Sequence, residues 1–226
     1  MLPEGLIMLS NVRLSFPWII EPQVRVFDKG ETKISYSCDL IMTPEHEGYK
    51  AFMLQVAKVA TGKWSKDGVK VLEMNKQHSN KRCYGSGDEK IGQKTMTVWD
   101  GYAGNVYITA TRDPKYGAPQ LYKSDGKPVD PLNTMEYNQV ARTMYGGCRV
   151  NCIVKPWAQD HPTGGRAIRS ELVAVQFAGH DDVFGEAKPE LSGVFAPVQV
   201  SENPNVESTA MPSAPFGELP DFLSVG

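Results

Sequence analysis

The sequence lacks most of the features by which metalloproteins, secreted proteins and membrane proteins are recognised. Its only cysteines, Cys38, Cys83, Cys148 and Cys152, include no C-x-x-C pair, so neither a disulfide framework nor a zinc ribbon is predicted and a reducing compartment is indicated. No window approaches the roughly 18 consecutive apolar residues of a membrane span, and the first residues lack the basic-then-apolar pattern of a signal peptide. We therefore expect neither secretion nor membrane contact.

Catalytic signatures are also missing. The segment "GYAGNVY" has neither the length nor the lysine of a phosphate-binding loop, and no G-x-S-x-G, H-E-x-x-H or paired-histidine motif occurs. A zinc site made of Cys148, Cys152, His161 and His180 is disfavoured, because residues four apart on a strand lie too far apart to share one ion comfortably. The sequence predicts no catalytic residue, no metal and no cofactor.

Charge is divided unevenly along the chain, although the formal net charge is only −2. Residues 181–226 carry eight acids and one base, a net charge of −7, whereas residues 1–180 carry 23 bases and 18 acids, a net charge of +5. An acidic tail on a basic body indicates nucleic-acid contact by the body and regulation or protein contact by the tail.

Alternating apolar residues predict a mainly β body. In "NVRLSF" the residues Val12, Leu14 and Phe16 share one face, which is typical of a half-buried strand. In "TKISYSCDLIM" the inward positions are Ile34, Tyr36, Cys38, Leu40 and Met42. Further strands are predicted at "KTMTVW", "NVYITATR", "CRVNCIVKPW" and "ELVAVQF", with glycine-rich turns between them.

One helix is predicted after the second strand, with Thr43 as N-cap, Pro44 at the first helical position and an end near Gly62. Residues 63–94 have no clear period and are expected to form a long loop with a short strand. The predicted fold is a small closed or nearly closed β-barrel with one or two helices and long inserted loops, over residues 1–180. Residues 181–226 are rich in Pro, Ser, Ala, Asn and Glu without a period and are predicted to be disordered.

The strand "YGGCRVNCIVKPW" has two unlike faces. Cys148, Val150, Cys152 and Val154 share a core face. The opposite face holds Tyr145, Arg149, Asn151, Lys155 and Trp157. Cations among aromatic rings suit a surface that follows a phosphate backbone and stacks on bases. A solvated sheet surface with Trp157 packed under a loop is the alternative.

Residues 58–94 hold nine bases and four acids. Within them "KWSK" and "KRCYG" place Trp64 and Tyr84 beside cations, so phosphate attraction and base stacking could act together, at about 1–3 kcal/mol for each stacked base. The alternative is a charged loop that only keeps the protein in solution.

Four segments, "LSFPWIIEP", "GYAGNVYITA", "MYGGCRVN" and "AGHDDVF", occur in this order between about residue 10 and residue 185. With them the chain resembles a family of tailed-phage single-stranded DNA-binding proteins, formerly a domain of unknown function and typified by an enterobacterial phage replication protein. The resemblance implies an OB-fold core that coats single-stranded DNA in phage replication or recombination, without sequence preference and without enzymatic activity, in the cytoplasm of the infected bacterial cell.

The residues expected to bind DNA on this interpretation are Lys63, Trp64, Lys66, Lys81, Arg82, Tyr84, Tyr102, Tyr107, Arg112, Lys115, Tyr116, Tyr145, Arg149, Asn151, Lys155 and Trp157. The end of the chain, "GELPDFLSVG", is similar in composition to the acidic ends of bacterial single-stranded DNA-binding proteins, which recruit replication partners and compete with DNA. The residues expected to dock phage or host replication proteins are Glu218, Leu219, Asp221, Phe222 and Leu223. Self-association along DNA is a further expectation.

Two other functions stay open from the sequence. One is a nuclease-like enzyme that acts through carboxylates such as Asp181 and Asp182, although these residues open an acidic stretch in which a solvated or regulatory role is favoured. The other is a virion or assembly protein whose β-barrel binds protein.

Overall fold

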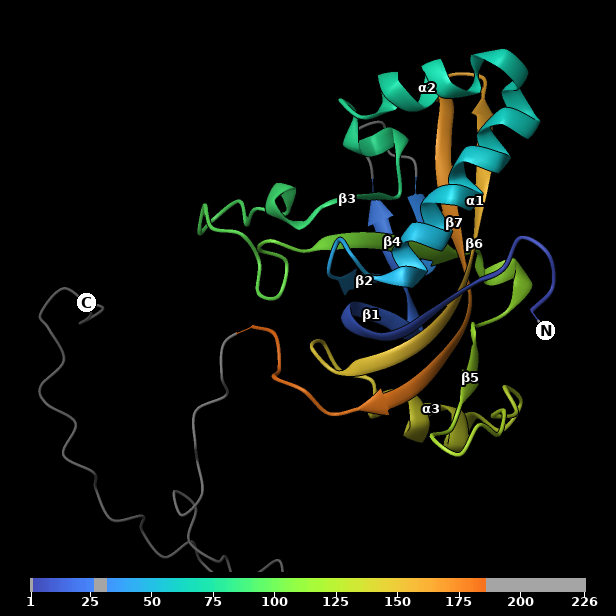
Figure 1. Ribbon diagram of the computed structural model, residues 1–226. Helices are drawn as coiled ribbons and strands as arrows, with labels where there is room; N and C mark the ends of the chain where they lie inside the picture. The colour runs from blue at the N-terminus through green and yellow to red at the C-terminus, as the bar shows by residue number, and fades with distance from the viewer. Residues whose placement is uncertain (1, 27–31, 186–226) are drawn as a thin grey trace, which may run out of the picture. The chain divides into compact units, whose positions relative to one another are not determined.

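The computed structural model describes residues 2–26 and 32–185 (Figure 1). Its strands are β1 (Ile7–Val26), β2 (Thr32–Met42), β3 (Tyr84–Ser86), β4 (Val106–Arg112), β5 (Gln120–Tyr122), β6 (Arg149–His161) and β7 (Gly165–Gly179). Its α-helices are α1 (Glu47–Trp64), α2 (Gly68–Asn75) and α3 (Thr134–Arg142), and short 3-10 turns span Ser65–Asp67, Ser79–Lys81, Gly87–Glu89 and Pro114–Tyr116. No helix in these two ranges is long and apolar enough to cross a membrane.

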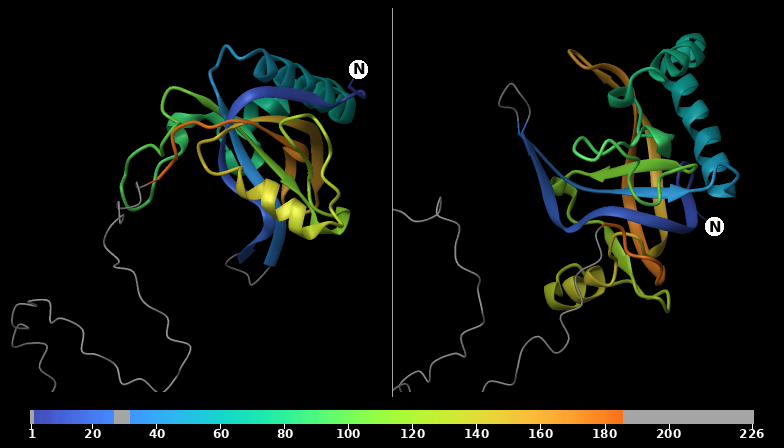
Figure 2. Two further views of the ribbon diagram at one scale, coloured as in Figure 1. Left: turned by 90° about the horizontal axis from the view of Figure 1, so that it is seen from below. Right: turned by 90° about the vertical axis from the view of Figure 1, so that its left-hand side faces the viewer.

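The long strands form a closed barrel in the order β4-β2-β1-β6-β7. These neighbours pair antiparallel, and a parallel pairing of β4 with β7, at Thr111 and Glu171, completes the ring. The short strands β3 and β5 extend β4 and β7. Figures 1 and 2 show α1 and α2 at one end of the barrel and α3 at the other. The predicted class, a mainly β, OB-fold-like barrel with helices and long inserted loops, is confirmed.

The two faces of β6 are as the alternation predicts. Val150, Cys152 and Val154 are buried in the barrel, at 1% exposure or less, whereas Lys155 and Trp157 are exposed. Cys148, just before the strand, is also fully buried. The barrel interior is therefore filled by the inward face that the sequence predicts.

Helix α1 lies against β1 and β6 and buries one stripe of residues at every fourth position: Gly48, Phe52, Val56, Ala60 and Trp64. Its N-cap is His46 and not Thr43, so that prediction is wrong. The His46 ring accepts a hydrogen bond from the N–H of Gly48 and lies 2.9 Å from the carbonyl oxygen of Ser10 on β1. The helix therefore begins where it docks on the barrel.

The predicted loop at residues 63–94 is largely helical, and this prediction is wrong except for its short strand, β3. Trp64 and Tyr84 are buried, at 6% and 8% exposure. The Trp64 indole N–H donates to Asp160 over 3.0 Å, and the Tyr84 ring lies 6.1 Å from that of Phe52. Both aromatic rings fill the contact between the helices and the barrel, because helix and strand each present one apolar face there.

Strand β1 does not keep a single alternation along its length. Its pairing with β2 shifts register between Ser15 and Trp18, and Phe16 has a φ of +47°. Ser15 is buried as a result, whereas Phe16 is 46% exposed, so the predicted inward position of Phe16 is wrong. A bulge of this kind re-aims a side chain toward the other face. Ile34 is exposed as well, contrary to prediction, since it lies near the end of β2 where the strand is paired only with β1.

The segment "KTMTVW", predicted as a strand, belongs to a long irregular loop between β3 and β4 that projects from the barrel (Figure 1). The buried carboxylate of Asp39 on β2 anchors it. Asp39 accepts hydrogen bonds from Lys90 Nζ at 2.9 Å, Tyr102 Oη at 2.7 Å and Thr109 Oγ1 at 2.5 Å. Burial and the nearby Asp39 carboxylate raise the pKa of Tyr102 well above its ordinary value, so its hydroxyl stays a donor at neutral pH.

From residue 186 onward, the predicted tail lies outside the described part of the chain. The predicted division into residues 1–180 and 181–226 stays a prediction.

Replacing Asp39 by Ala is expected to destabilise the protein by about 2–4 kcal/mol, because the buried Tyr102 hydroxyl and the partly buried Lys90 ammonium would lose this acceptor. The measurement is the free energy of unfolding in urea, together with hydrogen exchange of residues 90–105, which should become faster. Asp125→Ala, which removes an exposed carboxylate paired with Lys127, should leave both unchanged. An Asp39→Ala protein as stable as its parent would contradict the anchoring role.

Candidate nucleic-acid interface

Two adjoining hollows open on the outside of the barrel, and Lys33, Thr111 and Arg169 line both. The aromatic hollow is lined by Phe16, Trp18, Gln23, Arg25, Lys33, Ser37, Cys38, Asp39, Ser79, Asn80, Arg82, Cys83, Glu89, Lys90, Trp99, Tyr107, Thr109, Thr111, Arg169 and Ser170. The hairpin hollow is lined by Lys33, Ile34, Ser35, Thr111, Arg112, Asp113, Lys115, Tyr116, Lys155, Trp157, Gln159, Arg169 and Glu171. We call the two together the sheet groove.

Exposed aromatic rings stand in both hollows. In the aromatic hollow Phe16, Trp18 and Trp99 are 46%, 43% and 37% exposed. The rings of Phe16 and Trp99 meet edge to face, with their centroids 4.9 Å apart. In the hairpin hollow Trp157 and Tyr116 are 43% and 63% exposed. Large rings left this open in a hollow mark a contact surface, and their faces suit stacking on bases.

The groove carries a positive surplus. Eight bases and four acids line it, and each acid pairs with one base. The pairs are Arg82–Glu89, Lys90–Asp39, Arg112–Glu171 and Lys115–Asp113, at 2.6 to 3.2 Å. The other four bases, Arg25, Lys33, Lys155 and Arg169, have no acidic partner among residues 2–26 and 32–185. An anion entering the groove therefore meets four cations that no described carboxylate neutralises.

Lys33 and Arg169 are the cations shared by the two hollows, and hydrogen bonds hold Arg169 in place. Arg169 Nε donates to Gln159 Oε1 and its NH1 donates to the Asn80 carbonyl, both over 2.9 Å. Burial lowers the pKa of Lys33, and the neighbouring guanidinium groups of Arg169 and Arg25 lower it further. Burial also lowers the pKa of Arg169. A phosphate group between Lys33 and Arg169 would relieve this repulsion, so the site is suited to an anion.

Seven of the residues predicted to bind DNA line the sheet groove: Arg82, Tyr107, Arg112, Lys115, Tyr116, Lys155 and Trp157. The structure does not bring the other nine to it: Lys63, Trp64, Lys66, Lys81, Tyr84, Tyr102, Tyr145, Arg149 and Asn151. Trp64, Tyr84 and Tyr102 are at most 8% exposed, and a ring buried to this degree cannot stack on a base without leaving the core. Those three stacking roles are corrected on that ground. Tyr107, at 5% exposure, forms part of the floor of the groove.

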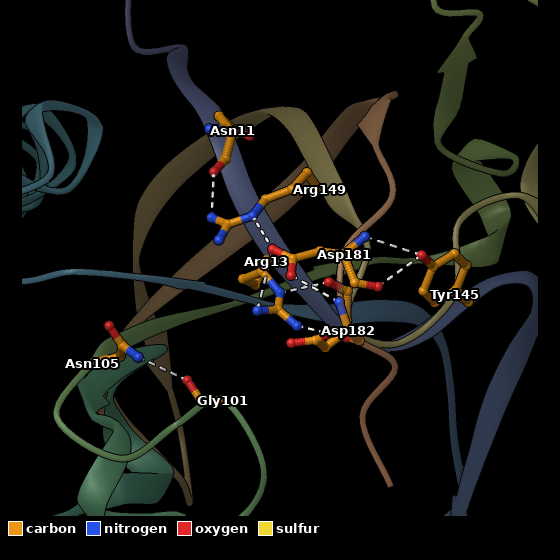
Figure 3. Close-up of polar contacts among 9 residues, drawn as sticks. Asn11, Arg13, Gly101, Asn105, Tyr145, Arg149, Asp181 and Asp182 are labelled. Atoms are coloured by element: carbon orange, nitrogen blue, oxygen red, sulfur yellow. Dashed lines mark hydrogen bonds and ion pairs between the residues drawn. The ribbon is translucent and has the colours of Figure 1, made fainter. Parts of the chain in front are cut away.

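On the mixed face of the "YGGCRVNCIVKPW" strand, two residues line the groove and three make contacts within the protein. Its Lys155 and Trp157 line the groove. Arg149 instead pairs with Asp181 over 2.6 Å and Tyr145 donates its hydroxyl to the Asp181 carbonyl (Figure 3). Asn151 accepts a hydrogen bond from the Asn11 N–H and donates one to Gln176. These three side chains are occupied by contacts within the protein.

The zinc set considered from the sequence is not assembled. His161 and His180 lie at opposite ends of the β6–β7 ladder, and Cys148 and Cys152 are buried as free thiols. In the described ranges no three His, Cys, Asp or Glu side chains gather closely enough to hold a metal ion.

Sequence reasoning missed seven groove residues that carry aromatic rings or positive charge: Phe16, Trp18, Arg25, Lys33, Lys90, Trp99 and Arg169. The segment "LSFPW" held a usable signal, because a proline between two aromatic residues interrupts the strand alternation and turns side chains outward. No local pattern marks Lys33 or Arg169, which come together only through the barrel closure.

A family model described as "Enterobacter phage Enc34, ssDNA-binding protein" matches residues 6–203. A curated relative, "Putative protein p50" of Acyrthosiphon pisum secondary endosymbiont phage 1, is 28% identical over 184 residues, covering 79% of this chain and 85% of the relative.

Two solved structures are similar to the barrel. The single-stranded DNA-binding protein from bacteriophage Enc34 in complex with ssDNA has a TM-score of 0.59 at 25% identity, covering 80% of this chain and 90% of that one. A C-terminal truncation of the same protein has a TM-score of 0.56 at 22% identity, covering 80% and 89%.

Replacing Lys33 or Arg169 by Ala is expected to weaken binding to oligo-dT about threefold to tenfold at low salt and to reduce the salt slope by about 1, because each contributes one phosphate contact. The measurement is a fluorescence titration at several salt concentrations. Lys63→Ala and Lys66→Ala, which remove exposed cations at the end of α1 away from the groove, are the matched controls. Equal losses in all four variants would show that only overall charge matters.

Proposed function

Because the chain belongs to the family of the Enterobacter phage Enc34 ssDNA-binding protein, we propose that it binds single-stranded DNA without sequence preference during phage DNA replication or recombination. The observation that carries this proposal is the sheet groove, which is lined both by exposed aromatic rings and by cations that no described acid neutralises. Rings supply stacking and cations supply phosphate attraction, which are the two contributions that hold an unpaired strand.

The groove is poorly equipped to read base edges, which supports sequence independence. Three side-chain amides line it, and two of them, Gln23 and Gln159, already accept a hydrogen bond from an arginine, Arg25 at 2.7 Å and Arg169 at 2.9 Å, which leaves only Asn80 of the three. Side-chain amides normally read bases in bidentate fashion. Here they orient arginines toward the backbone of the ligand, so affinity should depend little on sequence.

The same groove favours a single strand over a duplex. The rings of Trp18, Trp99 and Trp157 can stack only on bases whose faces are free. In a duplex those faces are covered by neighbouring base pairs. A duplex is therefore left with the phosphate attraction alone.

The two rival functions have less support. Asp181, the carboxylate considered for a nuclease, is ion-paired with Arg13 and Arg149, and the protein is proposed to be non-enzymatic. A protein-binding barrel would not require four unneutralised cations in its main groove. The cytoplasm of the infected bacterial cell is the proposed place of action, where single-stranded DNA arises during replication.

The binding proposal predicts that titration with oligo-dT quenches tryptophan emission and that affinity falls steeply with salt. Trp18→Ala and Trp157→Ala should each weaken binding by about 1–3 kcal/mol, the contribution of one stacked base. A duplex of matched length is the control and should bind more weakly with less quenching. Labelled DNA should stay intact with magnesium or manganese present.

Binding that ignores salt, or a duplex bound as tightly as oligo-dT, would overturn the proposed function. Metal-dependent cleavage of the labelled strand would support the nuclease instead.

The tail is proposed to compete with DNA and to dock replication proteins. Residues 181–226 carry a net charge of −7, and residues 1–180 carry +5. Asp181 is already paired with Arg13 and Arg149, so the charge available to compete is that of residues 186–226, six acids and one base, a net charge of −5. A flexibly tethered segment reaches an effective concentration of about millimolar near its own domain. Leu219, Phe222 and Leu223 are the apolar residues proposed to enter partner pockets, with Glu218 and Asp221 beside them. Self-association along DNA is proposed as a second protein contact.

A chain cut after residue 196 is expected to bind oligo-dT several-fold more tightly at about 20–50 mM salt, because DNA no longer displaces the tail. The gain should shrink as the Debye length contracts to about 3 Å near 1 M salt. Replacing Leu219, Phe222 and Leu223 by Ala in the full chain is the control, since it keeps the charge. This variant should bind DNA like its parent and lose contact with replication proteins. Equal affinity of the cut and full chains would contradict competition by the tail, and its acidic residues would then serve solubility alone.

A further inference from the structure

The chain that leaves β7 is fastened across the barrel by ion pairs. We call residues 180–185 the strap. The Asp181 carboxylate lies 2.6 Å from Arg149 Nε and 3.3 Å from Arg13 NH1 (Figure 3). Arg13 also donates to the carbonyls of Gly147, at 2.5 Å, and Asp182, at 2.6 Å. The N–H of Asp182 and the Arg149 guanidinium hold the pKa of Asp181 below its ordinary value, so this carboxylate is ionised at neutral pH.

The strap then closes onto the loop between β3 and β4. The Arg13 guanidinium lies over the Phe184 ring, 4.5 Å from its centroid, and the Phe184 N–H donates to the Gly146 carbonyl over 2.9 Å. The outer edge of the ring meets Gly101, where φ is +78° and a Cβ atom would collide with Phe184 Cζ and Cε1. One residue on, the Gly185 N–H donates to the Asp100 carboxylate over 3.0 Å. Figure 2 shows the end of the described chain running beside this loop.

Arg13 and Gly101, the residues that contact Phe184, are close in sequence to Phe16 and Trp99, the two rings that meet in the aromatic hollow. Arg13 lies three residues before Phe16 on β1, and Gly101 lies two residues after Trp99. The turn between them is tight, since the Tyr102 N–H donates to the Trp99 carbonyl over 3.1 Å. Phe184 therefore lies between the Arg13 side chain, which comes from the strand that carries Phe16, and the loop backbone that carries Trp99.

We propose that Phe184 and Asp181 are positioning residues for single-stranded DNA binding: the strap holds Phe16 and Trp99 together as one stacking surface. This inference rests on the proposed function of the sheet groove. Trp99 lies in a loop with no strand pairing beyond the single bridge of Ile91 with Val98. Asp39 anchors that loop from the barrel side, and the strap is the contact that anchors it from the other side.

The strap lies outside the barrel interior, so it can be altered without emptying the core. Asp181 is 24% exposed in its side chain, and Val183 is 68% exposed. Phe184 packs with the small cluster of Ile41, Tyr102 and Tyr107 and does not join the main core. Loss of its ring should free the loop and leave the barrel folded.

The test uses the full chain and oligo-dT. Phe184→Ala is expected to lower affinity about fivefold to tenfold, a loss on the scale of part of one stacked base. Val183→Ala, which changes an exposed side chain of the same strap, should bind like the parent. Hydrogen exchange at Tyr102 and Asn105 should become faster in Phe184→Ala, while the amides of β4 keep their protection.

A double-mutant cycle separates positioning from general stability. Trp99→Ala should weaken binding, and adding Phe184→Ala to it should cause no further loss, because the ring that the strap positions is gone. Phe184→Leu keeps apolar volume and provides a second variant if Phe184→Ala folds poorly, with affinity and loop protection between those of the parent and of Phe184→Ala.

The outcomes are distinguishable. Unchanged affinity in Phe184→Ala and Phe184→Leu, in a protein whose parent binds oligo-dT, would overturn the role of the strap alone. Additive losses in the Trp99→Ala background would do the same. A parent chain that does not bind oligo-dT would overturn the proposed function, and the inference with it.

Discussion

The buried carboxylate of Asp39 is the interaction on which the groove depends. A carboxylate at 5% exposure is unfavourable unless several donors surround it. Here Tyr102, Thr109 and Lys90 supply three. Two of these donors come from the irregular loop that carries Trp99, so satisfying the charge on the barrel also draws that loop onto it. The loop that carries Trp99 lies against the barrel because the Asp39 carboxylate takes two of its three donors from that loop.

The bases of the groove are held in place in two ways, and only one of them neutralises their charge. Its four acids hold four of its eight bases in ion pairs, Lys90 and Arg112 among them. Two of the remaining bases are oriented by neutral groups instead: Gln23 holds Arg25, and Gln159 and the Asn80 carbonyl hold Arg169. An amide acceptor fixes a guanidinium without cancelling its charge. Neutral orientation therefore preserves the attraction for an anion that an ion pair would remove.

Sequence reasoning succeeded where a pattern was local and the barrel preserved it. The alternation in β6 predicted Val150 and Cys152 inside and Lys155 and Trp157 outside, and the strand is regular at those positions. It failed at Phe16, where a bulge reverses the faces. It failed again at Trp64, whose neighbouring lysines suggested a binding loop although the ring fills the seam between α1 and the β6–β7 hairpin. Lys33 and Arg169 come together because β2 and β7 both pair with β4 in the closed barrel, a relation that no local window of sequence contains.

The net charge of the whole chain is a poor guide to what this surface attracts. With a formal net charge of −2 and an isoelectric point near 6.1, the protein is weakly acidic as a whole. Yet the groove holds a surplus of four positive charges, close to the surplus of five in all of residues 1–180. At a Debye length of about 8 Å in physiological salt, a phosphate in the groove interacts with the cations beside it and hardly at all with acids farther away. The local field, set by which acids are already paired, therefore favours an anion in the groove.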